Sequence, residues 1–448
     1  MKGVLTAVGG ILTLGVLLVV GTQLGLGLVG GLAAIGVAAF VAMLIALGPD
    51  RLGLTFLVVG LFLAPMNGVK PFSGGNVSFS DLSLVVAIAL LLPRMMKRGT
   101  HLPPLFLIGA AVMTVGGLLS CIFSVAPPVL SLGAFLRFAL AAILLPMIMS
   151  SIRPNPGTVT LMAWAYVAGQ IVSVGKATIE GAGPLGRSAG YTTHPNFFGL
   201  GGQIAFALLI FLFYRVPKHR RWIVVAATGI VVHGVLISGS RASLICVVLV
   251  TVLWPFVERS AVAWYVLVSA TAVLVVAAGS IFANAGEGSA LGRLRGDSLQ
   301  ATYSDQARKQ LLDAGTSMFW DHPVRGNGFA GVVELHNAYL EVAVGGGVLT
   351  LFGFLLLMAS FVRPLFDTAR PNRLAYVAVS YAAFGMLGPT LYDRIVWAPL
   401  AMVMIPVLGA RGDSVSQTAE SAAASNEGQP AVGAVSHRSA ATPRPVTG

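Results

Sequence analysis

An all-helical protein that crosses a membrane many times is the fold class that this sequence predicts. Three observations predict it: apolar residues make up 56 % of the 448 residues, charged residues make up only 10 %, and the mean hydropathy is +0.86. A soluble globular protein carries roughly 25 % charged residues. Uncharged runs of about 20 residues recur along the chain, and each is long enough to cross about 30 Å of hydrocarbon. These features exclude an ordinary soluble enzyme.

Apolar runs separated by charged or polar breaks predict about 12 to 14 transmembrane helices. In chain order the runs lie near 3–20, 25–47, 52–66, 80–93, 103–124, 128–150, 156–180, 196–214, 222–238, 242–257, 261–283, 337–362, 374–389 and 394–409. The first run follows Lys2 and leads into the second without a small-residue cleavage site, so we interpret it as a retained span and not as a signal peptide. Residues 1–410 are therefore expected to form one transmembrane domain.

The basic residues predict which side of the membrane each connection faces. With the N-terminus in the cytoplasm, fifteen Lys and Arg residues fall in inside loops, and five fall in the short outside loops: Lys70, Lys176, Arg187, Arg241 and Arg394. Cytoplasmic loops are enriched in Lys and Arg. We therefore expect both termini to be inside, in a cytoplasmic (inner) membrane, and we interpret the net charge of +12 as a sign of orientation and not of a nucleic-acid partner.

Two long polar segments lie outside the predicted spans. Residues 284–335 are expected to form an extracytoplasmic loop with an amphipathic helix, which would act as a lid. The apolar positions that predict this helix are Ala307, Leu311, Ala314 and Met318. Residues 411–448 are rich in Ala, Ser, Gly and Pro and contain no aromatic residue. They are expected to be a disordered cytoplasmic tail.

Several short motifs do not indicate chemistry in this context. Gly25-Leu-Gly-Leu-Val-Gly30 fits a GxGxxG pattern, but it opens a membrane span instead of joining a strand to a helix. The sequence has no Walker A motif, no HExxH motif and no Asp-x-Asp pair, and Cys121 and Cys246 both lie in apolar runs. We therefore expect no cofactor, no metal site and no disulfide framework.

Polar residues on three outside segments are the candidates for chemistry. They are Arg187 with His194, Pro195 and Asn196; Arg241 at the tip of a short turn after Ser240; and His336 with Asn337, where the long loop meets a span. Taken one at a time, each segment has a structural alternative: a snorkelling arginine, an asparagine that caps a helix, or a packed histidine. Taken together, they supply the groups that a reaction with a diphosphate leaving group needs. Arginine forks bind and neutralise a diphosphate, and an uncharged imidazole accepts a proton from an attacking hydroxyl.

The same residues resemble a known family. His336-Asn337, nine further residues and Gly347-Val-Leu-Thr350 are similar to the HN-x9-GxxG signature of the O-antigen ligase and O-antigen polymerase superfamily, with Thr350 in place of the last glycine. The segments Arg308 to Ala314 and Asp321 to Gly328 are similar to the helix and the turn that precede the family's histidine. The resemblance covers roughly residues 120–410.

This resemblance implies a metal-independent membrane glycosyltransferase of the GT-C kind. It implies that His336 activates the acceptor and that Arg187 and Arg241 hold an undecaprenyl-diphosphate-linked glycan donor. Supporting roles are implied for Arg308, Asn337, His194, Asn196 and Tyr339. The expected reaction transfers the glycan, with inversion, to an acceptor hydroxyl on the periplasmic or extracytoplasmic side of the membrane.

The family motif leaves the acceptor open. A glycolipid such as lipid A core would make the protein a ligase, another carrier-linked glycan would make it a polymerase, and a serine of a protein would make it an oligosaccharyltransferase. Two other classes also stay open: a transporter of a lipid-linked sugar, for which Arg137 in span 128–150 is the clearest intramembrane charge, and a structural partner of a polysaccharide export complex.

Overall fold

A computed structural model describes residues 27–406, except 72–76, 184–185, 284–285, 287, 296–298, 333 and 368–370. The predicted span 3–20 and the predicted tail 411–448 lie outside the described residues. The helices in chain order are α2 (Gly27–Leu63), α3 (Phe79–Arg98), α4 (Pro104–Ile122), α5 (Pro128–Ala139), α6 (Leu145–Ile152), α7 (Pro156–Glu180), α8 (Pro195–Arg215), α9 (Arg221–Ile237), α10 (Arg241–Glu258), α11 (Ala261–Ala283), α12 (Ala290–Arg295), α13 (Leu299–Asp321), α14 (Ala338–Val362), α15 (Tyr376–Gly385) and α16 (Arg394–Ala401). Short 3-10 turns separate several of them, and π-helical residues Leu140–Leu144 join α5 to α6.

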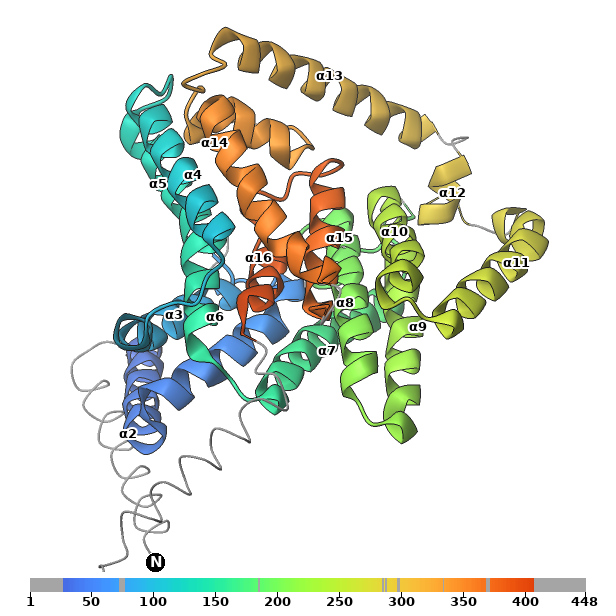
Figure 1. Cartoon of the computed structure of the whole chain (residues 1–448), viewed down its shortest axis with the longest axis horizontal. Coiled ribbons are helices and arrows are strands. Elements are labelled where there is room, and N and C mark those ends of the chain that lie inside the picture. The colour runs from blue at the N-terminus through green and yellow to red at the C-terminus, as the bar shows by residue number, and fades with distance from the viewer. Residues whose placement is uncertain are drawn as a thin grey trace, which may run out of the picture. The chain divides into compact units, whose positions relative to one another are not determined.

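Nine helices in the described part of the chain are long and apolar enough to cross a membrane, and that part contains no strand. Their outward-facing side chains include many large apolar ones, such as Val85, Ile122 and Ile179. The protein is therefore an all-helical polytopic membrane protein, as the composition predicts. Figure 1 shows these helices side by side, with α13 running across the end of the bundle that also carries the first turns of α14.

The N-terminal and C-terminal spans differ from the prediction. The two runs at 25–47 and 52–66 form the single element α2, whose two arms meet at a kink at Gly48 (φ 74°, ψ 162°). The predicted spans 374–389 and 394–409 are too long, because α15 has ten residues and α16 has eight. Gly388-Pro389 cannot continue a helix, and Pro399 removes a backbone donor within α16. Hydropathy alone does not register these breaks.

Small residues bring the central helices close together. Helix α8 contacts α7, α9, α10, α15 and α16, and most of its residues are buried. A Cβ atom at Gly109 of α4 would lie 2.8 Å from the backbone nitrogen of Leu357 on α14. A Cβ atom at Gly116 would lie 2.6 Å from Thr350 Oγ1. Glycine is thus required where α4 meets α14, which is typical of helix packing in membranes.

The outside loop contains the helix that was expected, but a different face is buried. In α13, Leu311 and Met318 are half-buried, whereas Ala307 and Ala314 are exposed. The buried position is Gly315, where an added Cβ would lie 2.7 Å from Leu335 Cδ1. Because glycine lets the helix backbone approach its neighbour, the contact face is rotated away from the alanines. An apolar pattern alone does not reveal such a contact.

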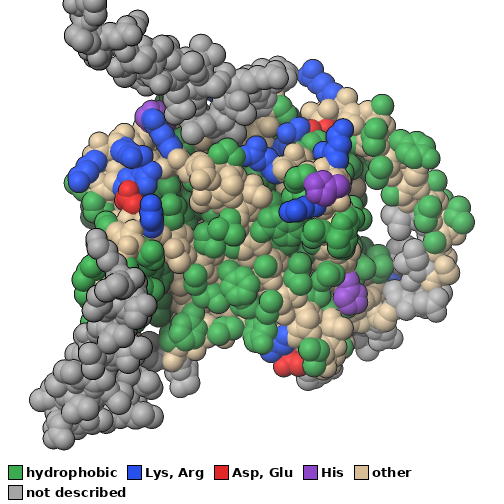
Figure 2. All heavy atoms as spheres, turned by 90° about the horizontal axis from the view of Figure 1, so that it is seen from below, with side chains coloured by type: hydrophobic (Ala, Val, Ile, Leu, Met, Phe, Trp, Pro, Cys, Tyr) green, Lys and Arg blue, Asp and Glu red, His purple; other side chains and the backbone are tan. Residues whose placement is uncertain are grey.

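Three connections that are predicted to face the cytoplasm contact one another. Arg94 pairs with Asp50 at 3.1 Å and donates to the Ile152 carbonyl oxygen at 2.7 Å, and all three residues belong to predicted inside connections. Figure 2 views the molecule from below Figure 1, and on that face Lys and Arg side chains gather in patches while acidic side chains are few. The α8–α9 connection, which contributes Lys218 and Arg220, lies at the lower edge of Figure 1. Cytoplasmic faces are rich in Lys and Arg, and the cytoplasmic position of the lower face stays a prediction.

The orientation can be measured by cysteine labelling in intact cells. A Gln310→Cys variant on α13 is expected to react with an impermeant maleimide, and a His219→Cys variant in the α8–α9 connection is expected to react only after the cells are opened. Both positions are exposed, and the native Cys121 and Cys246 are buried, so the background is expected to be low. Labelling of position 219 but not 310 in intact cells would reverse the proposed orientation.

Candidate functional site

The turn between α9 and α10 gathers arginines from three segments. Arg187 Nε donates to the Ser238 carbonyl oxygen at 3.0 Å, and Arg293 Nη1 donates to the Gly239 carbonyl oxygen at 2.8 Å. Arg241 follows as the first residue of α10, which the Ser240 side chain caps. Consecutive backbone carbonyl groups thus hold Arg187 of the first predicted segment and Arg293 of the outside loop next to Arg241.

Gly239 is essential to this turn. Its φ is +65°, and a Cβ atom there would lie 2.8 Å from Arg187 Nε. A side chain would therefore cost on the order of 1–2 kcal/mol in backbone strain and would also displace the Arg187 side chain.

We expect Gly239→Ala to weaken the binding of a multiply charged anion such as inorganic diphosphate about tenfold or more, because Arg187 would lose its position. Gly229→Ala on α9 is the matched control, since nothing lies within 4 Å of a Cβ atom at that position. Binding curves of both purified variants, with melting temperatures measured in parallel, check the expectation. A Gly239→Ala protein that binds diphosphate as tightly as the Gly229→Ala protein would show that the turn does not organise the site.

The other end of the Arg187 side chain is held by the start of α8. Arg187 Nη2 donates to Asn196 Oδ1 at 2.6 Å. Pro195 begins the helix, and the cap is His194 and not an asparagine, because His194 Nδ1 accepts the Asn196 backbone N–H at 3.1 Å. The sequence His194-Pro-Asn196 therefore orders both the helix start and the guanidinium.

Two residues of the outside loop that the sequence prediction missed belong to this cluster. Arg293 of α12 is 2 % exposed, and its Nε is buried without a hydrogen-bond partner among the described residues. Asp305 of α13 accepts from both terminal nitrogen atoms of Arg241, with one of the contacts at 3.0 Å, and lies 4.0 Å from Arg308. The regular spacing of α13 places Asp305 and Arg308 one turn apart, which is the only sequence signal that points to this pairing.

The site is strongly positive. Burial and the nearby charges of Arg293, Arg308 and Arg241 lower the pKa of Arg187 to about 10. Among the described residues, Asp305 is the acidic side chain that forms ion pairs within this cluster, and its partners are Arg241 and Arg308. Like charges that are held together in a partly buried place are unfavourable unless a counter-charge joins them. The arrangement is therefore suited to a ligand with several negative charges.

Two histidines lie within electrostatic reach of the arginines, and both are uncharged near neutral pH. Burial and the charge of Arg187 lower the pKa of His194 to about 4. Burial and the charge of Arg308 lower the pKa of His336, and Glu334 opposes this shift. Because His194 Nδ1 accepts a hydrogen bond, its proton is on Nε2, and it presents a donor. His336 Nδ1 is buried without a partner among the described residues, so Nε2 is the ring atom that can exchange a proton with a substrate.

A strained turn presents His336 to the site. His336 has a φ of +56°, which is uncommon for a residue with a side chain. Asn337 caps α14 by accepting the Leu340 N–H at 3.0 Å, and the buried Glu341 accepts the Leu335 N–H at 2.9 Å. These two contacts hold the backbone on both sides of His336. Sequence reasoning did not assign a role to Glu341.

The glycine part of the motif positions the loop that precedes the histidine. Gly347 (φ 72°) kinks α14, and loop residue Asn327 donates its N–H to the Val344 carbonyl oxygen at 2.8 Å beside that kink. Thr350, which stands at the last glycine position of the GxxG signature that the sequence resembles, is buried, and its hydroxyl donates to the Gly346 carbonyl oxygen at 2.6 Å. Gly116 on α4 provides the space that Thr350 needs.

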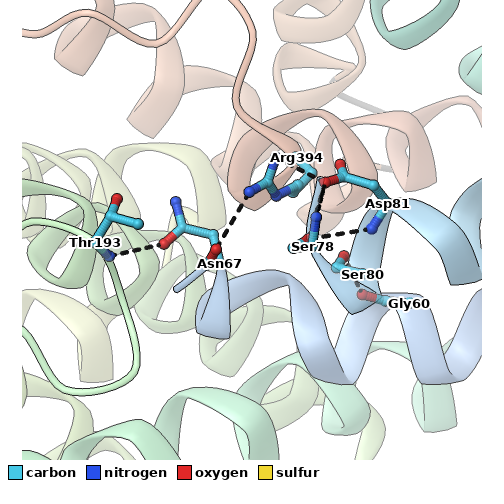
Figure 3. A network of polar contacts seen from close by, with 7 residues as sticks. All are labelled: Gly60, Asn67, Ser78, Ser80, Asp81, Thr193 and Arg394. Atoms are coloured by element: carbon cyan, nitrogen blue, oxygen red, sulfur yellow. Dashed lines mark hydrogen bonds and ion pairs between the residues drawn. The ribbon is translucent and has the colours of Figure 1, made fainter. Parts of the chain in front are cut away.

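A second polar network anchors the loop that carries His194 (Figure 3). Arg394 at the start of α16 pairs with Asp81 at 2.9 Å and donates to the Asn67 carbonyl oxygen at 3.3 Å. The Asn67 side chain accepts the Thr193 N–H at 3.2 Å. Ser78 and Asp81 form a capping box at the start of α3. Asn67, Ser78, Thr193 and Arg394 belong to connections that were predicted to face outside, and Asp81 lies at the start of the predicted span 80–93.

A cavity of about 430 Å³ lies between the end of α7 and the loop that carries Arg187. Its lining includes Lys176, Glu180, Arg187 and His194. Binding sites for small molecules occupy roughly 300–1,000 Å³. The cavity thus offers charged and hydrogen-bonding groups next to the arginine cluster, in a volume that suits part of a substrate.

The structure does not bring every predicted residue to this place. Tyr339 donates its hydroxyl to the Ala382 carbonyl oxygen of α15 at 2.9 Å and packs against Phe354, so its contacts are structural. Arg137 is exposed on α5. No group of three or more His, Cys, Asp or Glu that could hold a metal ion occurs in the described part of the chain.

Comparisons with known proteins do not place this chain in a family. No family model matches it, and a search of curated proteins found no match. A function must therefore be inferred from the chemistry of the site.

Proposed function

We propose that this protein is a membrane glycosyltransferase that moves a glycan from an undecaprenyl-diphosphate carrier to an acceptor hydroxyl at the outer face of the cytoplasmic membrane. The observation that carries this proposal is the convergence of Arg187, Arg241, Arg293 and Arg308 beside the uncharged His336. Arginine forks match phosphate oxygens in shape and charge. The surrounding apolar helices would accommodate the polyprenyl chain of the donor.

In the proposed reaction, the acceptor oxygen attacks the anomeric carbon of the glycan while the bond from that carbon to the diphosphate oxygen breaks. The electron pair leaves with the diphosphate, whose charge the arginines neutralise. The hydroxyl proton passes to Nε2 of His336. Preorganised positive groups that face a leaving group are among the largest contributions to catalysis. Direct displacement predicts inversion at the anomeric carbon.

The distribution of buried charge favours this reaction over transport of a lipid-linked sugar. A transporter commonly places ionisable residues near the middle of the membrane. Among the described residues, the buried ionisable side chains include Arg293, Glu341 and Glu258, whose side chain is 4 % exposed. Arg293 belongs to the arginine cluster, and Glu341 holds the turn that carries His336. Glu258 is the last residue of α10 and pairs with Arg373 at 2.6 Å, so none of these three residues lies at the middle of a spanning helix.

Glycan analysis of cells that lack the protein tests the proposal and separates the candidate acceptors. Loss of glycan from its final acceptor, together with accumulation of the donor at the outer face, is expected for a ligase or a protein glycosyltransferase. Loss of long chains while single units are still transferred would indicate a polymerase. Donor trapped at the inner face would contradict glycosyl transfer and favour transport.

The loss of activity at low pH is expected to follow the protonation of His336. A base that acts in its neutral form loses activity as the pH falls through its pKa, and burial and Arg308 lower that pKa below the usual value near 6.5. With saturating donor, kcat is therefore expected to fall to half its maximum at a pH below the ordinary imidazole value of about 6.5. Arg308→Gln is expected to move the fall to higher pH, whereas Lys309→Gln, at the exposed next position, is the control. A fall that begins near pH 8 in the wild-type enzyme would contradict the assignment.

A further inference from the structure

The arginine cluster has an internal anionic ligand, the carboxylate of Asp305. Both terminal nitrogen atoms of Arg241 donate to the two Asp305 oxygens. This two-point geometry is the one in which a guanidinium binds a phosphate. The Asp305 side chain is 50 % exposed, so it is not locked in place by burial. In this structure, Asp305 therefore occupies the face of Arg241 that a donor phosphate would need.

A diphosphate should be able to replace this carboxylate. Arg241 and Arg308 both lie near Asp305, and Arg187 and Arg293 add further positive charge, against the single negative charge of the carboxylate. A diphosphate carries more negative charge and more acceptor oxygens than a carboxylate. Partly exposed ion pairs contribute little to stability, so the Arg241–Asp305 pair opposes ligand binding only weakly.

The helix that carries Asp305 also touches the turn that carries His336. Gly315 lies ten residues further along α13, about 15 Å away at 1.5 Å per residue. A Cβ atom at Gly315 would lie 2.7 Å from Leu335 Cδ1 and 3.0 Å from Leu340 Cδ2. Leu335 precedes His336, and Leu340 lies in the first turn of α14. One rigid helix thus contacts the arginine cluster at Asp305 and the histidine turn at Gly315.

We propose that Asp305 takes the place of a donor phosphate on Arg241, and that the donor diphosphate displaces it and so shifts α13 against the His336 turn. Donor binding would then be coupled to the position of the group that activates the acceptor. This inference depends on the proposed function, because it requires that Arg241 bind a diphosphate. It assigns Asp305 a regulatory role, and it makes α13 the element that connects the two halves of the reaction.

The first test measures the affinity of the purified full chain in nanodiscs for undecaprenyl diphosphate. Asp305→Asn is expected to bind this lipid about twofold to fivefold more tightly than wild type, because a competing carboxylate is removed. Asp313→Asn is the matched control, because Asp313 is an exposed acid on the same helix. Unchanged or weaker binding by Asp305→Asn would overturn the inference, and so would equal tightening in both variants, which would indicate a general charge effect.

The second test measures whether α13 moves. Spin labels at Gln310→Cys on α13 and Ile179→Cys at the end of α7 report one distance, and both positions are exposed. Adding undecaprenyl diphosphate is expected to change the distance distribution, and Asp305→Asn is expected to show part of that change without the lipid. Binding without any change in distance would overturn the coupling.

The two proposals fail in different ways. If wild type does not bind undecaprenyl diphosphate, or if Arg241→Lys binds it as well as wild type does, the proposed function of the cluster is wrong. If the lipid binds and Arg241→Lys weakens it, but Asp305→Asn changes neither affinity nor distance, only the role of Asp305 is wrong.

Discussion

Replacing His336 with alanine is expected to abolish glycosyl transfer, with a loss of roughly 10²–10⁴-fold in turnover, because the acceptor hydroxyl would lose its proton acceptor. The protein level is expected to stay near normal, since His336 is only half-buried in a turn that Asn337 and Glu341 hold independently. The undecaprenyl-linked donor should accumulate in cells that carry the variant.

A second variant separates chemistry from backbone effects. His336 has a positive φ, and asparagine tolerates that conformation better than most residues. His336→Asn should therefore fold at least as well as the alanine variant and be equally inactive. His219→Ala, at an exposed position in the α8–α9 connection, serves as the control. Turnover of either His336 variant near the wild-type rate would remove the imidazole from the mechanism.

The second large effect is expected from replacing arginine with lysine. Activity should fall if the arginines bind a diphosphate, and should change little if they only anchor helix ends at the membrane surface. Lysine keeps the charge but cannot reproduce the planar fork. Arg187→Lys and Arg241→Lys are each expected to lose about 1–3 kcal/mol of charge-assisted hydrogen bonding, about tenfold to a hundredfold in rate. In the structure, Arg187 uses its fork on Ser238 and Asn196 as well, so lysine would also disturb its placement.

The double variant adds a test of shared function. Two side chains that grip one leaving group should show non-additive losses, because either loss already misplaces the group. Turnover of the two single variants and the double variant is measured with a lipid-diphosphate donor. Arg98→Lys is the control, because Arg98 is an exposed arginine at the end of α3 to which no role in the site is assigned. Wild-type rates for both single variants would leave the snorkelling interpretation in place.

Much of the fold could be predicted from the sequence, because the membrane imposes a length on every apolar run. Helix α7 begins and ends where the run 156–180 does, and α4 and α8 lie within two residues of their runs. The lengths of α15 and α16 could not be predicted from hydropathy, since Gly388, Pro389 and Pro399 interrupt runs that are apolar throughout. The kink at Gly48 is likewise a backbone effect that hydropathy does not report.

The part of the site that could be predicted consists of polar residues in connections that the charge pattern predicts to face outside. Arg187, Arg241 and His336 were selected for that reason, and the structure brings them within electrostatic reach of one another through Arg293 and Arg308. Their catalytic and binding roles stay predictions. Arg293 and Asp305 could not be selected, because an arginine and an aspartate in a polar loop are ordinary. Their importance follows from the contacts of α12 and α13 with the α9–α10 turn.

The most direct test of the diphosphate site is an equilibrium binding measurement on the purified protein in nanodiscs, with undecaprenyl diphosphate and undecaprenyl monophosphate compared. The four-arginine cluster predicts that the diphosphate binds at least about tenfold more tightly, since it can engage more than one guanidinium. It also predicts that Arg187→Gln, Arg241→Gln and Arg293→Gln each reduce that preference while the melting temperature stays close to wild type. Equal affinity for the two lipids, or a preference that survives all three substitutions, would contradict a diphosphate site at this cluster.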